Sequence, residues 1–414
     1  MKLHRPLVLG VADALREIFQ ENKYTGKVIE RLLKSNTKWG SRDRTFVAEN
    51  VYDMVRWWRL LLTVDGRQWT GDGGRETSGC FDEKNLFRLI GVNLILKKVE
   101  LPDWEEFEGL NPAEVFEKRK SLESRRAVIQ SIPDWLDETA AAGLGTAWDA
   151  EISALNETAP VVLRTNTLKI TKEELQKQLA EAGWESAEIE LAPDALVLAG
   201  RGNIFQSPLF KKGLFEVQDA GSQCIAPFVK AEPGMRVIDA CAGAGGKTLH
   251  LATLMQNKGS IIALDTETWK LKELHRRASR NGIDIVQGRP IVSTKVVKRL
   301  RNSAGRLLLD VPCSGLGVLR RNPDAKWKLS PEFLEQVRTT QAFILQRYST
   351  MLKPGGSMVY ATCSILPSEN ERQVETFLRN NTNFKLVEER KISPARDGFD
   401  GFYMARLEKA GGEG

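Results

Sequence analysis

The stretch "MRVIDACAGAGGKTLHLATLM", residues 235–255, decides the fold of this chain. It opens with a short apolar run that ends at Asp239, which is typical of a buried strand. A glycine-rich turn follows, and the segment from Lys247 onward predicts a helix. A strand, a glycine-rich turn and a helix in this order predict a doubly wound α/β domain with a ligand site at the turn.

Two better-known phosphate loops do not fit the turn "DACAGAGGKT", residues 239–248. A Walker A loop needs a glycine five residues before Gly246, and Cys241 stands there. A dinucleotide fingerprint that starts at Gly243 needs a third small residue where Thr248 stands. The broken fingerprint disfavours a nicotinamide-dependent oxidoreductase.

The next apolar run, "GSIIALD", ends at Asp265, where a doubly wound fold places a ribose-binding carboxylate. An adenosyl cofactor suits this arrangement. S-adenosylmethionine suits it best, because Lys247 and the amino terminus of the helix can hold the carboxylate of its methionine part. The alternative is a turn that needs glycine only for packing.

The 414 residues predict two or three domains. Residues 1–135 have apolar residues at spacings of three and four, which is typical of a helical domain, and residues 65–80 predict a polar surface loop. The first expected helix has one apolar face, made by Leu7, Val11, Ala14, Leu15 and Ile18.

Residues 136–215 alternate strand, helix and strand, which predicts a small α+β domain. Thr171 is the expected helix cap, and Glu174 completes a capping box. Residues 216–414 alternate strands with helices and predict a parallel sheet covered on both faces, with a final edge strand at "GFYMARLEK", residues 401–409.

Composition predicts a soluble globular protein, with 42% hydrophobic and 28% charged residues. No apolar run approaches the ~20 residues that cross a bilayer, and no signal core is evident, so we expect a cytoplasmic location. The five scattered cysteines argue against a disulfide framework. The absence of a C-x-x-C pair argues against zinc, so no metal is expected. We expect Cys80 and Cys224 to be inert.

The charge of +6 is unevenly spread. Residues 270–306 contain eleven Lys or Arg against the two acids Glu273 and Asp284. With Arg320 and Arg321, this basic stretch fits a surface that neutralises the phosphates of a nucleic acid. A solvated helix face with a loop is the other interpretation, and composition alone leaves both open.

Two more apolar runs lead into thiols. "LLLDVPCSGLG", residues 307–317, contains Asp310 and Cys313, and "MVYATCSILPSENE", residues 358–371, contains Cys363. Because ligands bind at the carboxyl ends of parallel strands, these residues can share one crevice with the predicted methyl donor. Two thiols there suit methylation of carbon 5 of a pyrimidine, in which one thiolate adds to carbon 6 and a second assists release.

These motifs together resemble the RNA (cytosine-5) methyltransferases of the Sun/Fmu (RsmB-like) family over residues 216–410. The resemblance implies a Rossmann-like methyltransferase domain at 216–414, with Cys363 as the nucleophile, Cys313 in product release and Asp310 on the target base or cofactor. It implies an RNA partner, with ribosomal RNA expected, and we expect a monomer. The implied S-adenosylmethionine site consists of Cys241, Ala242, Gly243, Ala244, Gly245, Gly246, Lys247, Asp265 and Asp310.

Two upstream segments extend the resemblance. "RTNTLKITKEELQKQL", residues 164–179, resembles the small RNA-binding subdomain of the family. "WGSRDRTFVAENVYDMVR", residues 39–56, resembles the NusB-like helical domain of some bacterial members. This implies that residues 1–135 contact RNA or the ribosome.

The sequence departs from the family at two places. Gly243 and Ala244 replace an Ala-Pro pair in the turn, and Arg289 stands where an aspartate commonly meets the adenosine part of the cofactor. We therefore assign no residue to the contact that this aspartate makes. A non-catalytic RNA-binding ribosome-assembly factor stays an alternative, as does a DNA cytosine methyltransferase, in which Cys313 would be the nucleophile.

Overall fold

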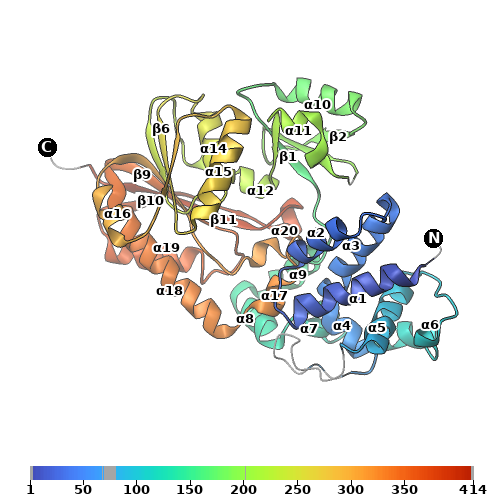
Figure 1. Cartoon of the computed structure of the whole chain (residues 1–414). Coiled ribbons are helices and arrows are strands. Elements are labelled where there is room, and N and C mark those ends of the chain that lie inside the picture. The colour runs from blue at the N-terminus through green and yellow to red at the C-terminus, as the bar shows by residue number, and fades with distance from the viewer. Residues whose placement is uncertain (1–2, 68, 70–80, 201, 412–414) are drawn as a thin grey trace. The chain divides into compact units, whose positions relative to one another are not determined.

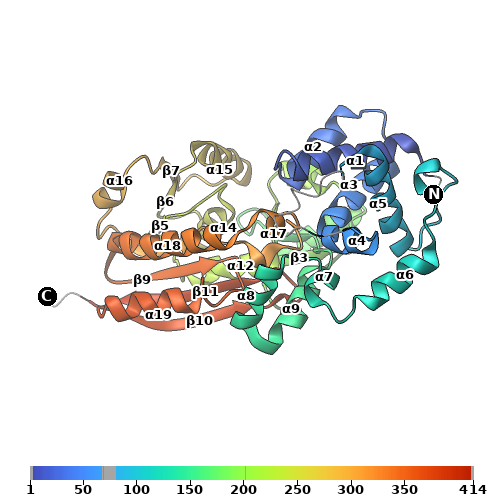
Figure 2. The same cartoon turned by 90° about the horizontal axis from the view of Figure 1, so that it is seen from below.

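The computed structural model describes residues 3–67, 69, 81–200 and 202–411, and its contacts divide the chain into two compact units (Figures 1 and 2). The helical unit comprises residues 1–157 and 319–331, and the sheet unit comprises residues 158–318 and 332–414. Cys80 and most of the expected surface loop lie outside the described residues. The domain boundaries after residues 135 and 215 stay predictions.

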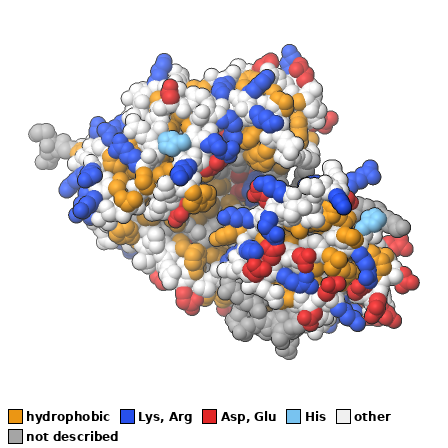
Figure 3. All heavy atoms as spheres, in the orientation of Figure 1, with side chains coloured by type: hydrophobic (Ala, Val, Ile, Leu, Met, Phe, Trp, Pro, Cys, Tyr) orange, Lys and Arg blue, Asp and Glu red, His pale blue; other side chains and the backbone are white. Residues whose placement is uncertain are grey.

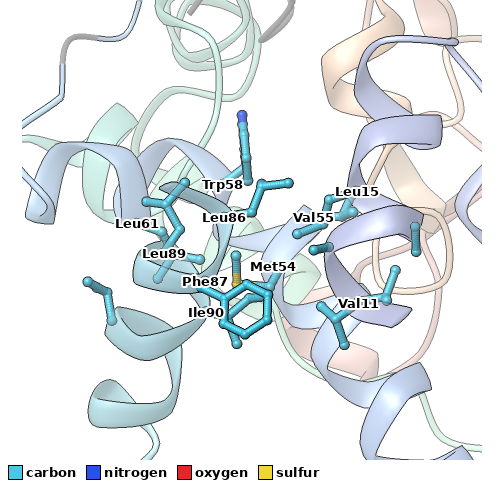
Figure 4. Packing of buried hydrophobic residues seen from close by; sticks show 14 of the residues in the cluster. Val11, Leu15, Met54, Val55, Trp58, Leu61, Leu86, Phe87, Leu89 and Ile90 are labelled. Atoms are coloured by element: carbon cyan, nitrogen blue, oxygen red, sulfur yellow. The ribbon is translucent and has the colours of Figure 1, made fainter. Parts of the chain in front are cut away.

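The helical unit buries the apolar faces of its helices in one core, part of which Figure 4 shows. The five apolar residues expected on one face of the first helix are all buried, which confirms that prediction. The rings of Phe19 and Trp58 stack with centroids 4.4 Å apart. The α-helices of residues 1–157 are α1 (Arg5–Phe19), α2 (Thr25–Ser35), α3 (Ser41–Arg56), α4 (Trp58–Val64), α5 (Glu83–Leu96), α6 (Pro112–Ser121), α7 (Arg126–Ile129), α8 (Asp134–Leu144) and α9 (Trp148–Leu155).

Residues 319–331, which carry the short helix α17 (Ala325–Lys328), complete the helical unit. The indole N–H of Trp327 donates to the carbonyl of Val55 at 2.7 Å. Arg320 is buried, and its Nε donates to the carbonyl of Ala154 at 2.7 Å. The prediction that Arg320 belongs to a phosphate-binding surface is therefore wrong, because its buried guanidinium pairs inside the unit with the Ala154 carbonyl and with the carboxylate of Glu157 at 3.5 Å.

The sheet unit contains a seven-stranded sheet in the order β10-β11-β9-β8-β5-β6-β7. Strands β5 to β9 pair in parallel, which confirms the predicted doubly wound sheet. The predicted edge position of β11 is wrong, because β11 pairs on both sides and the charged, exposed β10 forms the edge. The strands are β5 (Arg236–Asp239), β6 (Ser260–Asp265), β7 (Val286–Pro290), β8 (Ala304–Asp310), β9 (Leu352–Thr362), β10 (Phe384–Ile392) and β11 (Phe402–Lys409).

Helices cover both faces of this sheet, as the predicted alternation requires. Val237 joins the core on one face and its neighbour Ile238 joins the core on the other, because successive side chains of a strand point to opposite faces. The first core includes α13 (Ile225–Phe228), α14 (Gly246–Leu254) and α15 (Thr268–Asn281), and the second includes α16 (Thr294–Arg299), α18 (Pro331–Tyr348) and α19 (Glu371–Asn380).

A small antiparallel sheet, in the order β2-β3-β1-β4, precedes the large one in the chain. Thr171 caps α10 (Lys172–Glu181) by accepting the backbone N–H of Glu174 at 3.2 Å, as predicted. The Glu174 side chain accepts from Gln178 at 2.9 Å. The remaining elements are β1 (Val162–Thr165), β2 (Ser186–Glu188), β3 (Ala195–Leu198), β4 (Phe215–Val217), α11 (Pro208–Lys211), α12 (Ala220–Gln223) and α20 (Pro394–Asp397). Among the described residues, no helix is both long and apolar enough to span a bilayer.

Candidate active site at the carboxyl ends of the parallel strands

The structure brings the two thiols of the sequence motifs into contact. Cys313 follows β8 and Cys363 follows β9, which are neighbouring parallel strands. Their Sγ atoms lie 3.1 Å apart, so one thiol can donate a hydrogen bond to the other. Both side chains are only partly buried. The two sulfurs are therefore close enough to take part in one reaction.

The two thiols differ in their surroundings. The hydrogen bond to Cys363, together with burial and the nearby charge of Glu369, raises the pKa of Cys313 well above its ordinary value of 9.0. Cys313 is consequently a protonated thiol near neutral pH. It can donate its S–H to the sulfur of Cys363.

An ion pair lies at the point where the strand order reverses. Lys247, in the first turn of α14, places its Nζ 2.6 Å from Oδ2 of Asp310 at the end of β8. Burial acts to lower the pKa of Lys247, but the charge and hydrogen bond of Asp310 outweigh it and the pKa is raised. Both charged groups stay partly exposed. A switch point such as the one between β5 and β8 is where open α/β sheets bind ligands.

The glycine-rich turn has two glycines in the left-handed region, and they serve different purposes. Gly243 has φ +55°, and a Cβ there would meet no atom within 4 Å. Gly245 has φ +89°, and a Cβ there would lie 2.7 Å from the side chain of Leu274. Gly245 thus allows the turn to pack on α15, whereas Gly243 leaves open space beside the backbone.

Asp265 closes the other side of this turn. Its carboxylate accepts the backbone N–H of Gly243 at 2.9 Å and that of Glu267 at 2.8 Å. The Nζ of Lys270 is 3.9 Å from the same carboxylate. The structure therefore joins Asp265 to the turn.

The other predicted residues of the turn are held by their backbones. Ala242 donates its N–H to Leu264, and the carbonyl of Ala244 accepts from Arg277. The carbonyl of Gly246 accepts from the buried guanidinium of Arg164 in the small sheet. Burial, aided by the charges of neighbouring aspartates, raises the pKa of Cys241 well above its ordinary value, so this thiol is unsuited to act as a nucleophile.

Two buried acids at this edge were not among the predicted site residues. Asp239 ends β5 and accepts the hydroxyl of Thr248 at 2.6 Å, and burial raises its pKa to about 7. Glu369 is fully buried between the loops that carry Cys313 and Cys363, the two cysteine loops. The signal for Asp239 was its place at the end of an apolar run. Glu369 lies inside the quoted Cys363 motif, but nothing local marks it as buried.

Part of the basic stretch is used inside the sheet unit. Arg277 and Arg280 both form ion pairs with the buried Glu216 of β4, which removes them from the predicted phosphate-binding surface. Arg289 is exposed and donates to Gln287 at 3.0 Å. The other exposed cations in this stretch are Lys272, Arg276, Lys295, Lys298, Arg299 and Arg301.

Among the residues that the structure describes, no group of three or more His, Cys, Asp or Glu side chains is arranged to hold a metal ion. Cys224, expected to be inert, is buried, and burial raises its pKa to about 11. A separate cavity of about 460 Å³ lies in the helical unit and contains none of the predicted site residues.

Comparison with known proteins gives concordant matches. The family model described as "16S rRNA methyltransferase RsmB/F" matches residues 226–408, and the RsmF/B-like ferredoxin-like domain model matches residues 132–205. "Probable ribosomal RNA small subunit methyltransferase B" of Synechocystis sp. is 30% identical over 438 residues, which cover 96% of this chain and 98% of that protein. Ribosomal RNA small subunit methyltransferase B of Pasteurella multocida is 37% identical over 67% of this chain and 65% of its own.

Solved structures resemble the chain as well. The crystal structure of PH0851 matches with a TM-score of 0.80 at 25% identity, over 99% of this chain and 100% of that one. A methyltransferase homologue from Pyrococcus horikoshii matches with a TM-score of 0.62 at 26% identity, over 69% and 97% of the two chains.

Proposed function

Because the chain belongs to the RsmB/F family of 16S rRNA methyltransferases, we propose that it methylates carbon 5 of a cytosine in ribosomal RNA through a covalent bond to Cys363. S-adenosylmethionine is the proposed methyl donor. The observation that carries this proposal is the 3.1 Å contact between the two thiols, beside the pair of Lys247 and Asp310.

The residues of the turn fit S-adenosylmethionine. The open space beside Gly243 gives a ligand room, and Asp265 places a carboxylate at the same turn. Residues 241–247, Asp265 and Asp310 are the proposed ligands, with Lys247 suited to a carboxylate. Bound here, the cofactor would supply an electrophilic methyl group. A solved structure described as NSun6 from Pyrococcus horikoshii with SFG shares the fold, at a TM-score of 0.62 and 22% identity.

The thiols divide the proposed chemistry between them. The thiolate of Cys363 bonds to carbon 6 of the cytosine, and the electron pair of the ring double bond moves to carbon 5, which accepts the methyl group. A base then removes the proton of carbon 5, the double bond forms again and the sulfur of Cys363 leaves. Cys313 assists this last step, because its protonated thiol can donate to the departing sulfur.

RNA is proposed to contact the sheet unit over α15 and α16. Figure 3 shows Lys and Arg side chains over this part of the surface, where the exposed cations named above lie. Lysine and arginine bind phosphates in a way that does not depend on sequence. The small sheet and the helical unit are the further proposed RNA contacts, and the NusB-like nature of residues 1–135 stays part of this proposal.

The cavity of the helical unit supports an RNA contact there. Its lining combines the ring of Trp57 with Lys97 and Arg119, which suits a stacked base and its phosphate. Asp53 pairs with Lys97 at 2.7 Å. We expect Trp57→Ala to weaken binding of 16S rRNA about tenfold in filter binding, and Trp57→Phe to retain it. Equal binding by all three proteins would remove this cavity from the RNA surface.

Bisulfite sequencing tests the proposed reaction. Cytosines in 16S rRNA from cells with the protein should include one that resists conversion, and the same position should convert in cells without it. Treating 16S rRNA from cells without the protein with purified protein and S-adenosylmethionine should make that cytosine resist conversion again. RNA binding without any restored position would favour the non-catalytic ribosome-assembly factor.

A further inference from the structure

One buried carboxylate connects the two cysteine loops. Glu369 has no exposed surface, and its two oxygens accept four hydrogen bonds. Its Oε2 accepts the backbone N–H of Ser314 at 2.8 Å and the amide of Gln341 at 3.0 Å. Its Oε1 accepts the hydroxyls of Ser314 and Ser364, each at 2.5 Å. A carboxylate suits this place because it offers acceptors only.

The donors stand directly beside the thiols. Ser314 follows Cys313 in the chain, and Ser364 follows Cys363. The amide of Gln341, in α18, also donates to the carbonyl of Pro312 at 2.9 Å, so this loop is held on both sides of its cysteine. Any displacement of Glu369 therefore loosens the residue that follows each cysteine.

The neighbouring Asn370 strengthens the hold on the second loop. Its Oδ1 accepts the hydroxyl of Thr362 at 2.5 Å, and its Nδ2 donates to the carbonyl of Ser364 at 2.9 Å. The loops are also joined by the backbone N–H of Gly317, which donates to the backbone carbonyl of Cys363 at 2.9 Å. Beyond the ends of β8 and β9, where sheet pairing stops, these hydrogen bonds hold the two loops together.

We propose that Glu369 is a positioning residue that holds Cys313 and Cys363 at reacting distance, a role that rests on the proposed function of these thiols. Formation of the RNA adduct needs only Cys363, whereas its breakdown uses both sulfurs together. Loosening the loops therefore slows breakdown more than formation, because a displacement of ~1 Å in a reacting group costs up to about 100-fold in rate. The adduct should accumulate.

The first experiment compares Glu369→Gln with wild type in the full chain, without RNA or cofactor. The amide has a single acceptor oxygen, so it cannot accept all four hydrogen bonds. Oxidised glutathione converts the two thiols into a disulfide and releases two molecules of reduced glutathione. Thiol labelling and mass spectrometry measure how readily the Cys313–Cys363 bond forms. We expect the effective concentration of the pair to fall at least about tenfold in Glu369→Gln.

Glu369 and its donors Ser314, Gln341 and Ser364 form a hydrogen-bonded group, the Glu369 clamp. Glu375→Gln is the matched control, since this exposed glutamate lies on α19 just beyond the clamp. It should oxidise like wild type. Equal disulfide formation in all three proteins would overturn the positioning role. Because this measurement needs no methylation, it decides the proposal even if the protein fails to methylate cytosine.

The second experiment follows the adduct on a denaturing gel with 16S rRNA and S-adenosylmethionine. Glu369→Gln should lower turnover and leave more covalent RNA adduct than wild type, and a purely structural defect would instead lower turnover and adduct together. If Glu369→Gln does not fold, Ser364→Ala removes one of the four hydrogen bonds and should shift both measurements in the same direction by a smaller factor. Unchanged values in Ser364→Ala would contradict the clamp.

Discussion

The sulfurs of Cys313 and Cys363 lie 3.1 Å apart although 50 residues separate them in the chain. Neighbouring parallel strands produce this contact, because β8 and β9 end at the same edge of the sheet. The contact raises the pKa of Cys313 well above its ordinary value, which keeps this thiol protonated near neutral pH.

The first prediction separates the two thiols. Cys363→Ala should abolish methylation and form no RNA adduct, because the bond to carbon 6 cannot form. Cys313→Ala should allow attack but block release, and trap enzyme on RNA as a denaturant-resistant band. A denaturing gel with radiolabelled RNA measures both. Adducts from Cys363→Ala and none from Cys313→Ala would reverse the roles and indicate the DNA-type mechanism.

The second prediction concerns the cofactor. Asp265→Ala should weaken binding of S-adenosylmethionine, because the ribose loses a charged acceptor worth about 1.5–3 kcal/mol and the turn loses its bond from Gly243. Isothermal titration calorimetry measures the change. Asp284→Asn, an exposed acid elsewhere in the unit, should bind like wild type. Equal affinity of Asp265→Ala and wild type would remove Asp265 from the site.

The third prediction concerns RNA binding by α16. Replacing Lys295, Lys298 and Arg299 by alanine together should make the dependence of affinity on salt less steep, by about 0.7 in log–log slope for each lost contact with single-stranded RNA. The matched control replaces the exposed Arg372, Arg379 and Lys385, which removes the same charge from α19 and β10. Identical slopes for the two triple variants would show that α16 is a solvated helix face and does not bind the phosphates of RNA.

The fourth prediction concerns pH and stability. Burial raises the pKa of Asp239 from 3.8 to about 7, so its contribution to stability is complete below pH 3.8 and is lost as the pH rises through about 7. Burial lowers the pKa of His250 from 6.5 to about 4, so its contribution is present above pH 6.5 and is lost as the pH falls to about 4. The two effects oppose each other in the wild type.

Single variants should reveal them. Asp239→Asn should gain stability relative to wild type as the pH rises from 5 to 8, and His250→Phe should gain it as the pH falls from 6.5 to 4. Each slope is limited to about 1.4 kcal/mol per pH unit. Thermal unfolding without ligand across this range measures both. Parallel pH profiles for wild type and both variants would show that neither group titrates as its burial requires.

Local patterns in the sequence were sufficient for the central features of the fold. The apolar runs, the glycine-rich turn and the spacing of helices predicted the parallel sheet and its covered faces. The same patterns placed Cys313 and Cys363 at strand ends, and parallel strands that end at one edge bring such residues together. Neighbouring residues are sufficient to determine these features, because strand and turn preferences act over a few positions of the chain.

Tertiary structure decided which residues become partners. Arg277 and Arg280 looked like free cations, but the buried Glu216 pairs with both, and Arg320 lies inside the helical unit. Only the folded chain shows that β11 lies between β9 and β10. Likewise, the clamp at Glu369 exists only where two loops and a helix meet. A sequence pattern does not record such partners, because burial and hydrogen bonding here join segments that lie far apart in the chain.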